Sequence, residues 1–184
     1  MDYSKYLNPA AASLPQSGIR RFFDLAANIP DCISLGVGEP DFATPWEIRD
    51  AAIKSIQSGK TQYTSNAGLL SLREEIAGYL SSRFKADYDP KTEIIVTIGA
   101  SEAIDLALRT LVTAGDEVLI PSPSYVSYAP NAAIVGGAAV PLETRAEEDF
   151  VLTPEILEKA ITPRSKVLIL PYPNNPTGAI MTRE

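Results

Sequence analysis

Lys166-Val-Leu-Ile-Leu-Pro-Tyr-Pro-Asn-Asn-Pro-Thr-Gly178 is the stretch of sequence that decides the fold. It begins with an apolar run that has the length and composition of a buried strand. The residues that follow are rich in Pro, Asn and Gly, which predicts a loop at the end of that strand. Loops in this position often hold ligands in α/β proteins, so we expect the Asn175-Pro-Thr-Gly178 segment to line a binding site.

Further apolar runs alternate with amphipathic segments through the second half of the chain. This alternation predicts an α/β fold with a mainly parallel sheet and helices packed on its faces. The strand after Gly136-Gly137 is short enough to form an edge of that sheet. The expected strands are 93–98, 116–120, 138–142 and 166–170, and the expected helices are 101–112, one after Ser124, and 153–160.

The first part of the chain has a less regular pattern. Residues 17–26 indicate a short helix that follows an arm, and residues 32–35 indicate a brief extended segment. A helix over 46–58 is expected, with Thr44 as its N-cap, Pro45 in its first turn and Gly59 as its C-terminal stop.

A second amphipathic helix is expected over residues 69–80, because Leu69, Leu72, Ile76 and Leu80 recur at helical spacing.

The composition argues against several classes of function. The net charge is −7, whereas nucleic acids and anionic membranes are bound by clustered Lys and Arg, so neither partner is expected. The sequence has no His and a single cysteine, Cys32, so we expect no intrachain disulfide, no Ser-His-Asp triad within the chain and no metal site. No segment resembles a signal peptide or a transmembrane helix, which predicts a soluble, cytoplasmic protein.

Three of the predicted loops lie at the carboxyl ends of strands, where the ligand crevice of an open α/β sheet is found. The first is Ile98-Gly-Ala-Ser-Glu-Ala103, which opens a helix. Its unpaired backbone N–H groups and the Ser101 hydroxyl would suit an anion such as a phosphate. The alternative is that Ser101 is a plain N-cap, and this alternative is favoured when the segment is considered alone.

The other two loops carry an aromatic and an amide side chain. Tyr125 could present its ring to a ligand or be a half-buried residue that covers the end of the sheet. Asn175 precedes a proline, which confines its backbone to an extended conformation and could direct its side chain into the crevice. Its alternative is a simple Asx-Pro turn. The Gly36-Val-Gly38 segment lacks the third glycine and the following helix of a dinucleotide-binding fingerprint.

Seven short motifs are spread along the chain in a defined order. They are Ser34-Leu-Gly-Val-Gly-Glu-Pro-Asp-Phe42, Tyr63 within Lys60-Thr-Gln-Tyr-Thr, Gly68-Leu-Leu-Ser-Leu-Arg-Glu, Thr97-Ile-Gly-Ala-Ser-Glu-Ala, Gly115-Asp-Glu-Val, Pro123-Ser-Tyr and Asn174-Asn-Pro-Thr-Gly. In this order and spacing the chain resembles the N-terminal part of a class I/II aminotransferase, in the aspartate-aminotransferase-like group of fold-type I pyridoxal-phosphate enzymes. The resemblance runs from about residue 17 to the end of the sequence.

The resemblance implies a fold, a division into domains and a cofactor. Residues 46–184 would form the first, incomplete part of a three-layer αβα large domain with a mainly parallel sheet. Residues 1–45 would form an N-terminal arm and part of the small domain. The implied cofactor is pyridoxal 5′-phosphate, and the implied reaction transfers an amino group between an amino acid and a 2-oxo acid.

Family contacts to the cofactor fall on identifiable positions of this sequence. The resemblance implies that the backbone at Ala100 and Ser101 holds the phosphate. It implies that Tyr125 stacks on the pyridine ring and that Asn175 forms a hydrogen bond with the phenolic oxygen. Tyr63 would reach into the phosphate site of the neighbouring subunit, which implies a homodimer.

Two further positions concern the substrate. The resemblance implies that the backbone of Gly38 meets the substrate carboxylate, where a glycine permits close approach. It also implies that Ile19, in the arm, lines the substrate pocket.

Three groups that transamination requires have no counterpart in this sequence. In the family, the Schiff-base lysine, the acidic partner of the pyridine nitrogen and the Arg that binds the substrate carboxylate all lie downstream of the Asn-Pro-Thr-Gly loop. None of the lysines has the expected Ser-x-Ser-Lys context; they are Lys5, Lys54, Lys60, Lys85, Lys91, Lys159 and Lys166. We therefore expect no catalytic residue here and no activity from the 184-residue chain alone. The alternatives are a lyase with the same cofactor and fold, and a non-enzymatic binding or regulatory module.

Overall fold

The computed structural model describes residues 3–15, 25, 28–33, 36, 38 and 40–182. The predicted helix at 17–26, apart from Leu25, lies outside the described residues, as does Ile19. The chain divides into two compact units, one formed by Met1–Ser17 with Ile98–Glu184 and the other by Gly18–Thr97.

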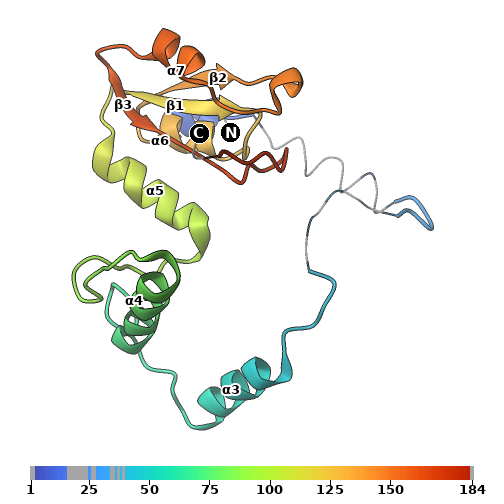
Figure 1. Ribbon diagram of the computed structural model, residues 1–184, viewed down its shortest axis with the longest axis vertical. Coiled ribbons are helices and arrows are strands. Elements are labelled where there is room, and N and C mark those ends of the chain that lie inside the picture. The colour runs from blue at the N-terminus through green and yellow to red at the C-terminus, as the bar shows by residue number, and fades with distance from the viewer. Residues whose placement is uncertain are drawn as a thin grey trace. The chain divides into compact units, whose positions relative to one another are not determined.

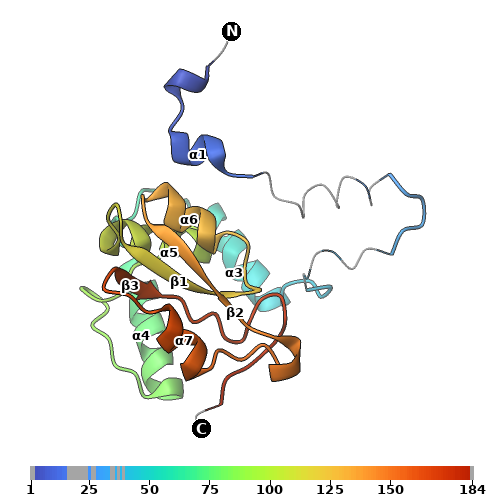
Figure 2. The ribbon, with the colours of Figure 1, turned by 90° about the horizontal axis from the view of Figure 1, so that it is seen from above.

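The first unit is built around a parallel sheet. Strands β1 (Glu117–Ser122), β2 (Ala138–Glu143) and β3 (Ser165–Leu168) are arranged in the order β2-β1-β3. Both pairs are parallel, so the predicted parallel sheet is confirmed, and β2 is an edge strand as expected. Figures 1 and 2 show β1 between its two neighbours.

Helices cover both faces of this sheet. The helices α5 (Gly99–Leu111) and α6 (Tyr128–Ile134) pack against Val118 and Ile120, while α7 (Pro154–Ala160) packs against the face that carries Leu119. Successive residues of a strand point to opposite faces, so the apolar residues of β1 contribute to a hydrophobic core on each face of the sheet. Figure 1 shows α7 above the sheet and α6 below it. The predicted three-layer αβα arrangement is confirmed.

Smaller elements complete the first unit. The single turn η1 (Ser4–Tyr6) and the short helix α1 (Pro9–Ser13) precede the gap in the described residues, and η2 (Ala146–Glu148) follows β2. Asn8 caps α1, since its Oδ1 accepts a hydrogen bond from the N–H of Ala10 at 2.9 Å. Although α1 lies far from α6 in sequence, the two helices are in contact.

The second unit contains helices α3 (Trp46–Gln57) and α4 (Leu70–Phe84). The predicted Thr44 N-cap is wrong, because Pro45 takes the N-cap position with an extended ψ of 143° and no side chain caps the helix. Gly59 is confirmed as the stop. Its φ of +72° and the bonds from its N–H to Ile56 and from Lys60 N–H to Ser55 form the αL termination that glycine favours.

The predicted strand at 93–98 is wrong. Among the described residues these positions belong to no sheet, and the N–H of Val96 donates to the carbonyl of Ala67, at 3.0 Å, within the second unit. The apolar side chains of this segment are not buried either, since Ile95 is 59% and Ile98 91% exposed. Helix α6 also begins later than predicted, because a turn closed by the Tyr128 N–H and the Tyr125 carbonyl precedes it.

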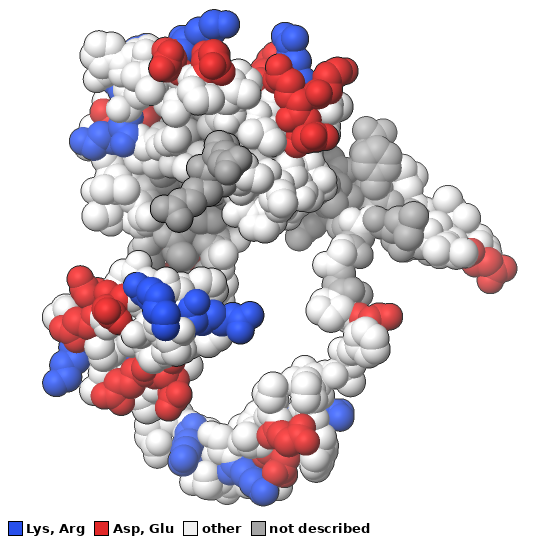
Figure 3. Space-filling view, viewed as in Figure 1, with Lys and Arg blue, Asp and Glu red and all other residues white. Residues whose placement is uncertain are grey.

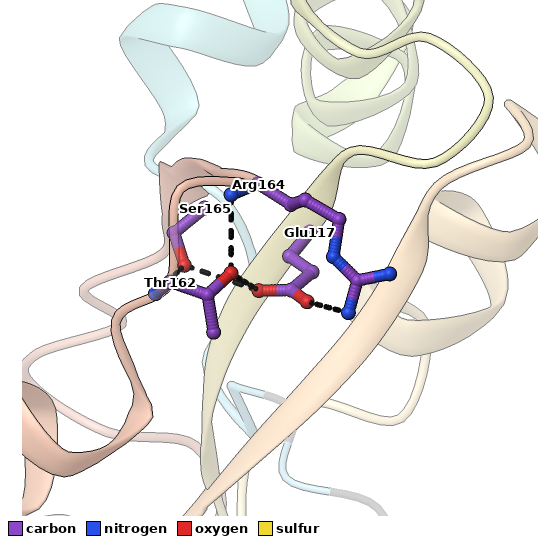
Figure 4. A network of polar contacts seen from close by, with 4 residues as sticks. All are labelled: Glu117, Thr162, Arg164 and Ser165. Atoms are coloured by element: carbon purple, nitrogen blue, oxygen red, sulfur yellow. Dashed lines mark hydrogen bonds and ion pairs between the residues drawn. The ribbon is translucent and has the colours of Figure 1, made fainter.

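A buried carboxylate joins β1 to the start of β3. Glu117 Oε1 pairs with Arg164 at 2.6 Å, and its Oε2 accepts hydrogen bonds from the hydroxyls of Thr162 at 2.6 Å and Ser165 at 3.2 Å (Figure 4). The Thr162 bond is the leading cause that lowers the pKa of Glu117. Because parallel strands share one direction, this network lies at the amino end of β1, away from the edge where ligands are expected.

Charged side chains of both signs are mixed on the surface. On the face seen in Figure 3, Asp and Glu lie beside Lys and Arg on both units. Among the described residues, no helix has both the length and the apolar character that a membrane crossing requires.

Candidate functional site

Three loops of the first unit meet at the carboxyl end of the sheet. They are residues 98–101 at the start of α5, residues 121–128 after β1 and residues 171–178 after β3, and we call them the three-loop site. The Ser101 side chain lies close enough to the Tyr125 hydroxyl to lower the pKa of Tyr125, which brings the first two loops together. The Asn174 Nδ2 donates to the Pro123 carbonyl at 3.3 Å, which connects the second and third. The sequence predicted these three loops, and the structure brings them together.

The first loop presents the N-terminus of a helix. The N-cap is Ile98, so Ala100 and Ser101 are the second and third helical residues, and their N–H groups have no acceptor within the helix. The prediction that Ser101 could be a plain N-cap is therefore wrong. Gly99 has a φ of +76°, a conformation that favours glycine and turns the chain into α5. The N–H of Ile98 donates to the Glu102 carboxylate.

Tyr125 places an aromatic ring in the second loop. The residue is 36% exposed, so part of the ring remains accessible. Its ring meets that of Tyr128 edge to face, with 5.5 Å between the centroids and an interplanar angle of 81°. The nearby Ser101 side chain is the leading cause that lowers the pKa of Tyr125. The ring thus packs against Tyr128 and is partly exposed.

The two adjacent asparagines of the third loop have opposite environments. Asn174 is buried, with 6% exposure, and its Oδ1 accepts hydrogen bonds from the N–H and the hydroxyl of Thr177 at 3.2 and 3.0 Å. Asn175 is exposed. The turn that the sequence offered as the alternative role of Asn175 is therefore made by Asn174, and the Asn175 side chain is left available.

The backbone of this loop is closed on itself. The N–H of Asn174 donates to the carbonyl of Ala179, and the N–H of Gly178 donates to the carbonyl of Asn174, both at 2.8 Å. Gly178 has a φ of +74°, which explains the glycine of the motif. The role of Asn174 was missed from the sequence. The spacing of Asn174 and Thr177, three residues apart, is the signal that could have revealed it, because Asn side chains commonly cap the N–H of nearby residues.

The remaining predicted site residues lie in the second unit or outside the described part. Gly38 is exposed, and a Cβ built on it would meet nothing within 4 Å. Tyr63 is fully exposed. Ile19 lies outside the described residues. The structure therefore brings together Ala100, Ser101, Tyr125 and the loop of Asn175, and it leaves the other three predictions untested.

The chemistry of the three-loop site suits an aromatic phosphate ester. Backbone N–H groups at the positive end of a helix bind phosphate, an accessible tyrosine ring offers a stacking surface, and an exposed amide can bond a ring oxygen. These donor types fit pyridoxal 5′-phosphate. All the lysines of the sequence are described, and none belongs to these loops. The described residues contain no cluster of His, Cys, Asp or Glu that could hold a metal ion.

A separate cavity of about 280 Å³ lies beside Tyr125. Neither Ser101 nor Asn175 lines it, so it is not the space that the three loops share. Its lining is mostly apolar and comes from the end of β1, the loop that follows it, the start of α6 and β2: Ile120, Pro121, Ser122, Ser124, Tyr125, Val126, Ala129, Ala139 and Pro141.

Comparison with known sequences gives extensive matches. The sequence model of the aminotransferase class I and II family matches residues 30–184. The putative aminotransferase YugH of Bacillus subtilis is 48% identical over 181 residues, which cover 98% of this chain and 47% of that protein. Aromatic-amino-acid aminotransferase 2 of Thermococcus litoralis is 45% identical over 168 residues, which cover 91% of this chain and 43% of that protein. The chain spans about half the length of the curated relatives it matches.

Comparison with solved structures agrees. The structure of aspartate aminotransferase from Thermus thermophilus with maleate matches with a TM-score of 0.90 at 36% identity. The match covers 96% of this chain and 47% of that one. This similarity confirms the predicted fold-type I architecture.

Proposed function

Because the chain belongs to the class I and II aminotransferase family, we propose that it is the N-terminal part of an enzyme that transfers an amino group between an amino acid and a 2-oxo acid. The proposed cofactor is pyridoxal 5′-phosphate, whose ring serves as an electron sink when it is bound. The observation that carries the proposal is the three-loop site, in which the Ser101 side chain lies beside the Tyr125 hydroxyl and Asn174 bonds the Pro123 carbonyl.

Each loop has a proposed task in binding. The N–H groups of Ala100 and Ser101 would hold the phosphate, where the helix dipole adds a favourable field. Tyr125 would cover one face of the pyridine ring, and the Ser101 side chain beside its hydroxyl belongs to the proposed phosphate site. Asn175 would donate to the phenolic oxygen. These residues position the cofactor and exclude water from one of its faces.

The other proposed contacts involve the second unit and a partner subunit. Gly38 would let its backbone approach the substrate carboxylate, and Ile19 would line the substrate pocket. Tyr63 would contribute to the phosphate site of a second copy, so that the complete protein acts as a homodimer. We also propose that, in the complete protein, residues 1–45 form the arm and part of the small domain and residues 46–184 form the first part of the large domain.

The lysine that reacts with the cofactor is proposed to lie outside these 184 residues. The placement of the lysines supports this. Lys54 pairs with Asp50 on α3 at 2.7 Å, Lys85 bonds the Ser82 carbonyl after α4, and Lys166 is exposed near the amino end of β3. A lysine at the carboxyl end of the sheet would be required to reach a group held by the three-loop site.

The proposal is tested with the complete protein and the 184-residue chain in parallel. Each is incubated with pyridoxal 5′-phosphate, reduced with borohydride and digested, and labelled lysines are mapped by mass spectrometry. We expect one label per chain in the complete protein, 2-oxo acid formation from an amino acid, and neither in the 184-residue chain. A stoichiometric label on one lysine of the short chain, with turnover, would contradict the proposed position of the lysine. Absence of cofactor binding by the complete protein would contradict the proposed function.

A further inference from the structure

We infer that Asn174 is a positioning residue that fixes the distance between the Asn175 loop and the Tyr125 loop, so that the two walls of the cofactor site are held as one piece. The inference rests on the proposed function for the identity of the ligand. It gives the two adjacent asparagines different roles: Asn175 contacts the ligand and Asn174 holds the loop in place. The burial and the hydrogen bonds of the two residues carry the argument.

The side chain of Asn174 uses both of its ends. Its Oδ1 accepts two hydrogen bonds from Thr177, which closes the turn that follows Asn175. Its Nδ2 donates across to the Pro123 carbonyl, two residues before Tyr125. Asn174 is only 6% exposed, so removing one end of its side chain leaves a buried partner unpaired, which costs free energy of folding.

The turn itself is reinforced by a second set of bonds. The Thr177 hydroxyl, which donates to Asn174, also accepts a bond from the N–H of Ala179 at 3.2 Å. The backbone of Asn174 bonds Ala179 and Gly178. Asn175 therefore lies within a loop closed by its own hydrogen bonds, and the bond from Asn174 to Pro123 links this loop to the loop of Tyr125.

An asparagine-to-aspartate substitution separates these roles. In Asn174→Asp the carboxylate keeps an acceptor for Thr177 but loses the donor to Pro123, and it places an oxygen against a carbonyl oxygen. The matched control is Asn175→Asp, which adds the same charge one residue away at an exposed position. A difference between the two variants therefore reports what is particular to the buried position, which is the lost inter-loop hydrogen bond together with the burial of the charge, rather than the added charge alone.

The first arm of the experiment needs no cofactor. Hydrogen exchange of the complete protein, without cofactor, is followed by mass spectrometry on peptides that cover residues 171–179 and 121–128. We expect Asn174→Asp to speed exchange in the 171–179 peptide on the order of tenfold, the effect of one lost hydrogen bond of ordinary strength, and Asn175→Asp to leave it unchanged. Equal exchange in the two variants would overturn the inference.

The second arm measures binding of pyridoxal 5′-phosphate and the pH dependence of its visible absorption in the complete protein. The variants are Asn174→Ala, Asn175→Ala and the double variant. If Asn174 acts through Asn175, each single variant weakens binding and moves the absorption midpoint in the same direction, and the double variant adds little more. Fully additive effects, or a lowered melting temperature of Asn174→Ala with an unmoved absorption midpoint, would show a merely structural residue and overturn the inference.

The two arms separate failure of the inference from failure of the proposed function. A complete protein that binds no pyridoxal 5′-phosphate refutes the proposed function and the cofactor part of the inference. The exchange arm still decides whether Asn174 holds the two loops together.

Discussion

Replacing Leu142 by alanine tests whether the sheet is the stable core of the first unit. Leu142 lies on the edge strand β2, is 1% exposed and packs with Leu119 and Leu152 on the face covered by α7. The substitution deletes three carbon atoms from this cluster. At about 0.8 kcal/mol for each buried methylene group, the lost transfer free energy is about 2.4 kcal/mol.

The cavity left behind adds to that cost. A residual cavity of about 40 Å³ at roughly 24 cal/mol per Å³ contributes about 1 kcal/mol, which brings the expected loss in unfolding free energy to between about 3 and 4 kcal/mol. The matched control is Leu111→Ala, because Leu111 belongs to the same unit and is 50% exposed. Substitutions at such surface positions change stability by about 0.5 kcal/mol or less.

Hydrogen exchange of the β1 amides in the 184-residue chain is the suitable assay, because it reports the opening of the sheet rather than of the whole chain. A loss of about 3 kcal/mol speeds exchange through sheet opening roughly 100-fold, since each 1.4 kcal/mol is a factor of ten. Equal exchange rates in the Leu142 and Leu111 variants would refute the reasoning, because the α7 face would then not be a packed core.

Further predictions concern the buried polar groups and the glycines. The pKa of Glu117 is lowered in the folded state, so the ionised side chain stabilises the fold above the ordinary pKa of 4.5, and this stabilisation is lost as the pH falls below that value. The melting temperature of Glu117→Gln should therefore change less than that of the wild type between about pH 6 and pH 3. The Tyr172 hydroxyl donates to the Phe150 carbonyl at 2.9 Å and accepts from the Leu152 N–H at 3.1 Å. Tyr172→Phe removes both bonds, and urea denaturation should show a loss in unfolding free energy of about 1–3 kcal/mol. Gly137→Ala places a Cβ 2.6 Å from the Val112 side chain and should destabilise by about 1–3 kcal/mol, whereas Gly78→Ala, with nothing within 4 Å, should stabilise by about 0.5–1 kcal/mol in the same assay.

Much of the sheet could be predicted from the sequence because its central strand, β1, is buried on both faces and its neighbours carry apolar segments. The continuous apolar run of β1 and the apolar segments of β2 and β3 stand out from their polar flanks, and such runs have few alternatives in an α/β chain. Residues 93–98 carry a similar apolar pattern but form no strand. An apolar pattern alone does not make a strand, because a strand also requires a neighbour with which to form its ladder, and among the described residues this segment has none.

The site was predicted less completely than the fold. The positions of Tyr125 and Asn175 follow from loops at the ends of β1 and β3, whereas the strand expected before Ala100 and Ser101 does not form and only the helix start at these residues was predicted correctly. The hydrogen bonds that join those loops are long-range, and no local pattern encodes which side chain crosses from one loop to the other. For the same reason the bond from Asn174 to Pro123 emerged from the structure alone.

The contact between α1 and α6 has a consequence for the order of folding. Ribosomes release a chain from its N-terminus, so α1 emerges early and the residues of α6 only after the entire second unit has been synthesised. The N-terminal segment must therefore wait, without its docking surface, while the intervening residues emerge. The sheet unit is completed late, and a stalled or shortened translation product that ends before Tyr128 would leave α1 exposed to chaperones and proteases.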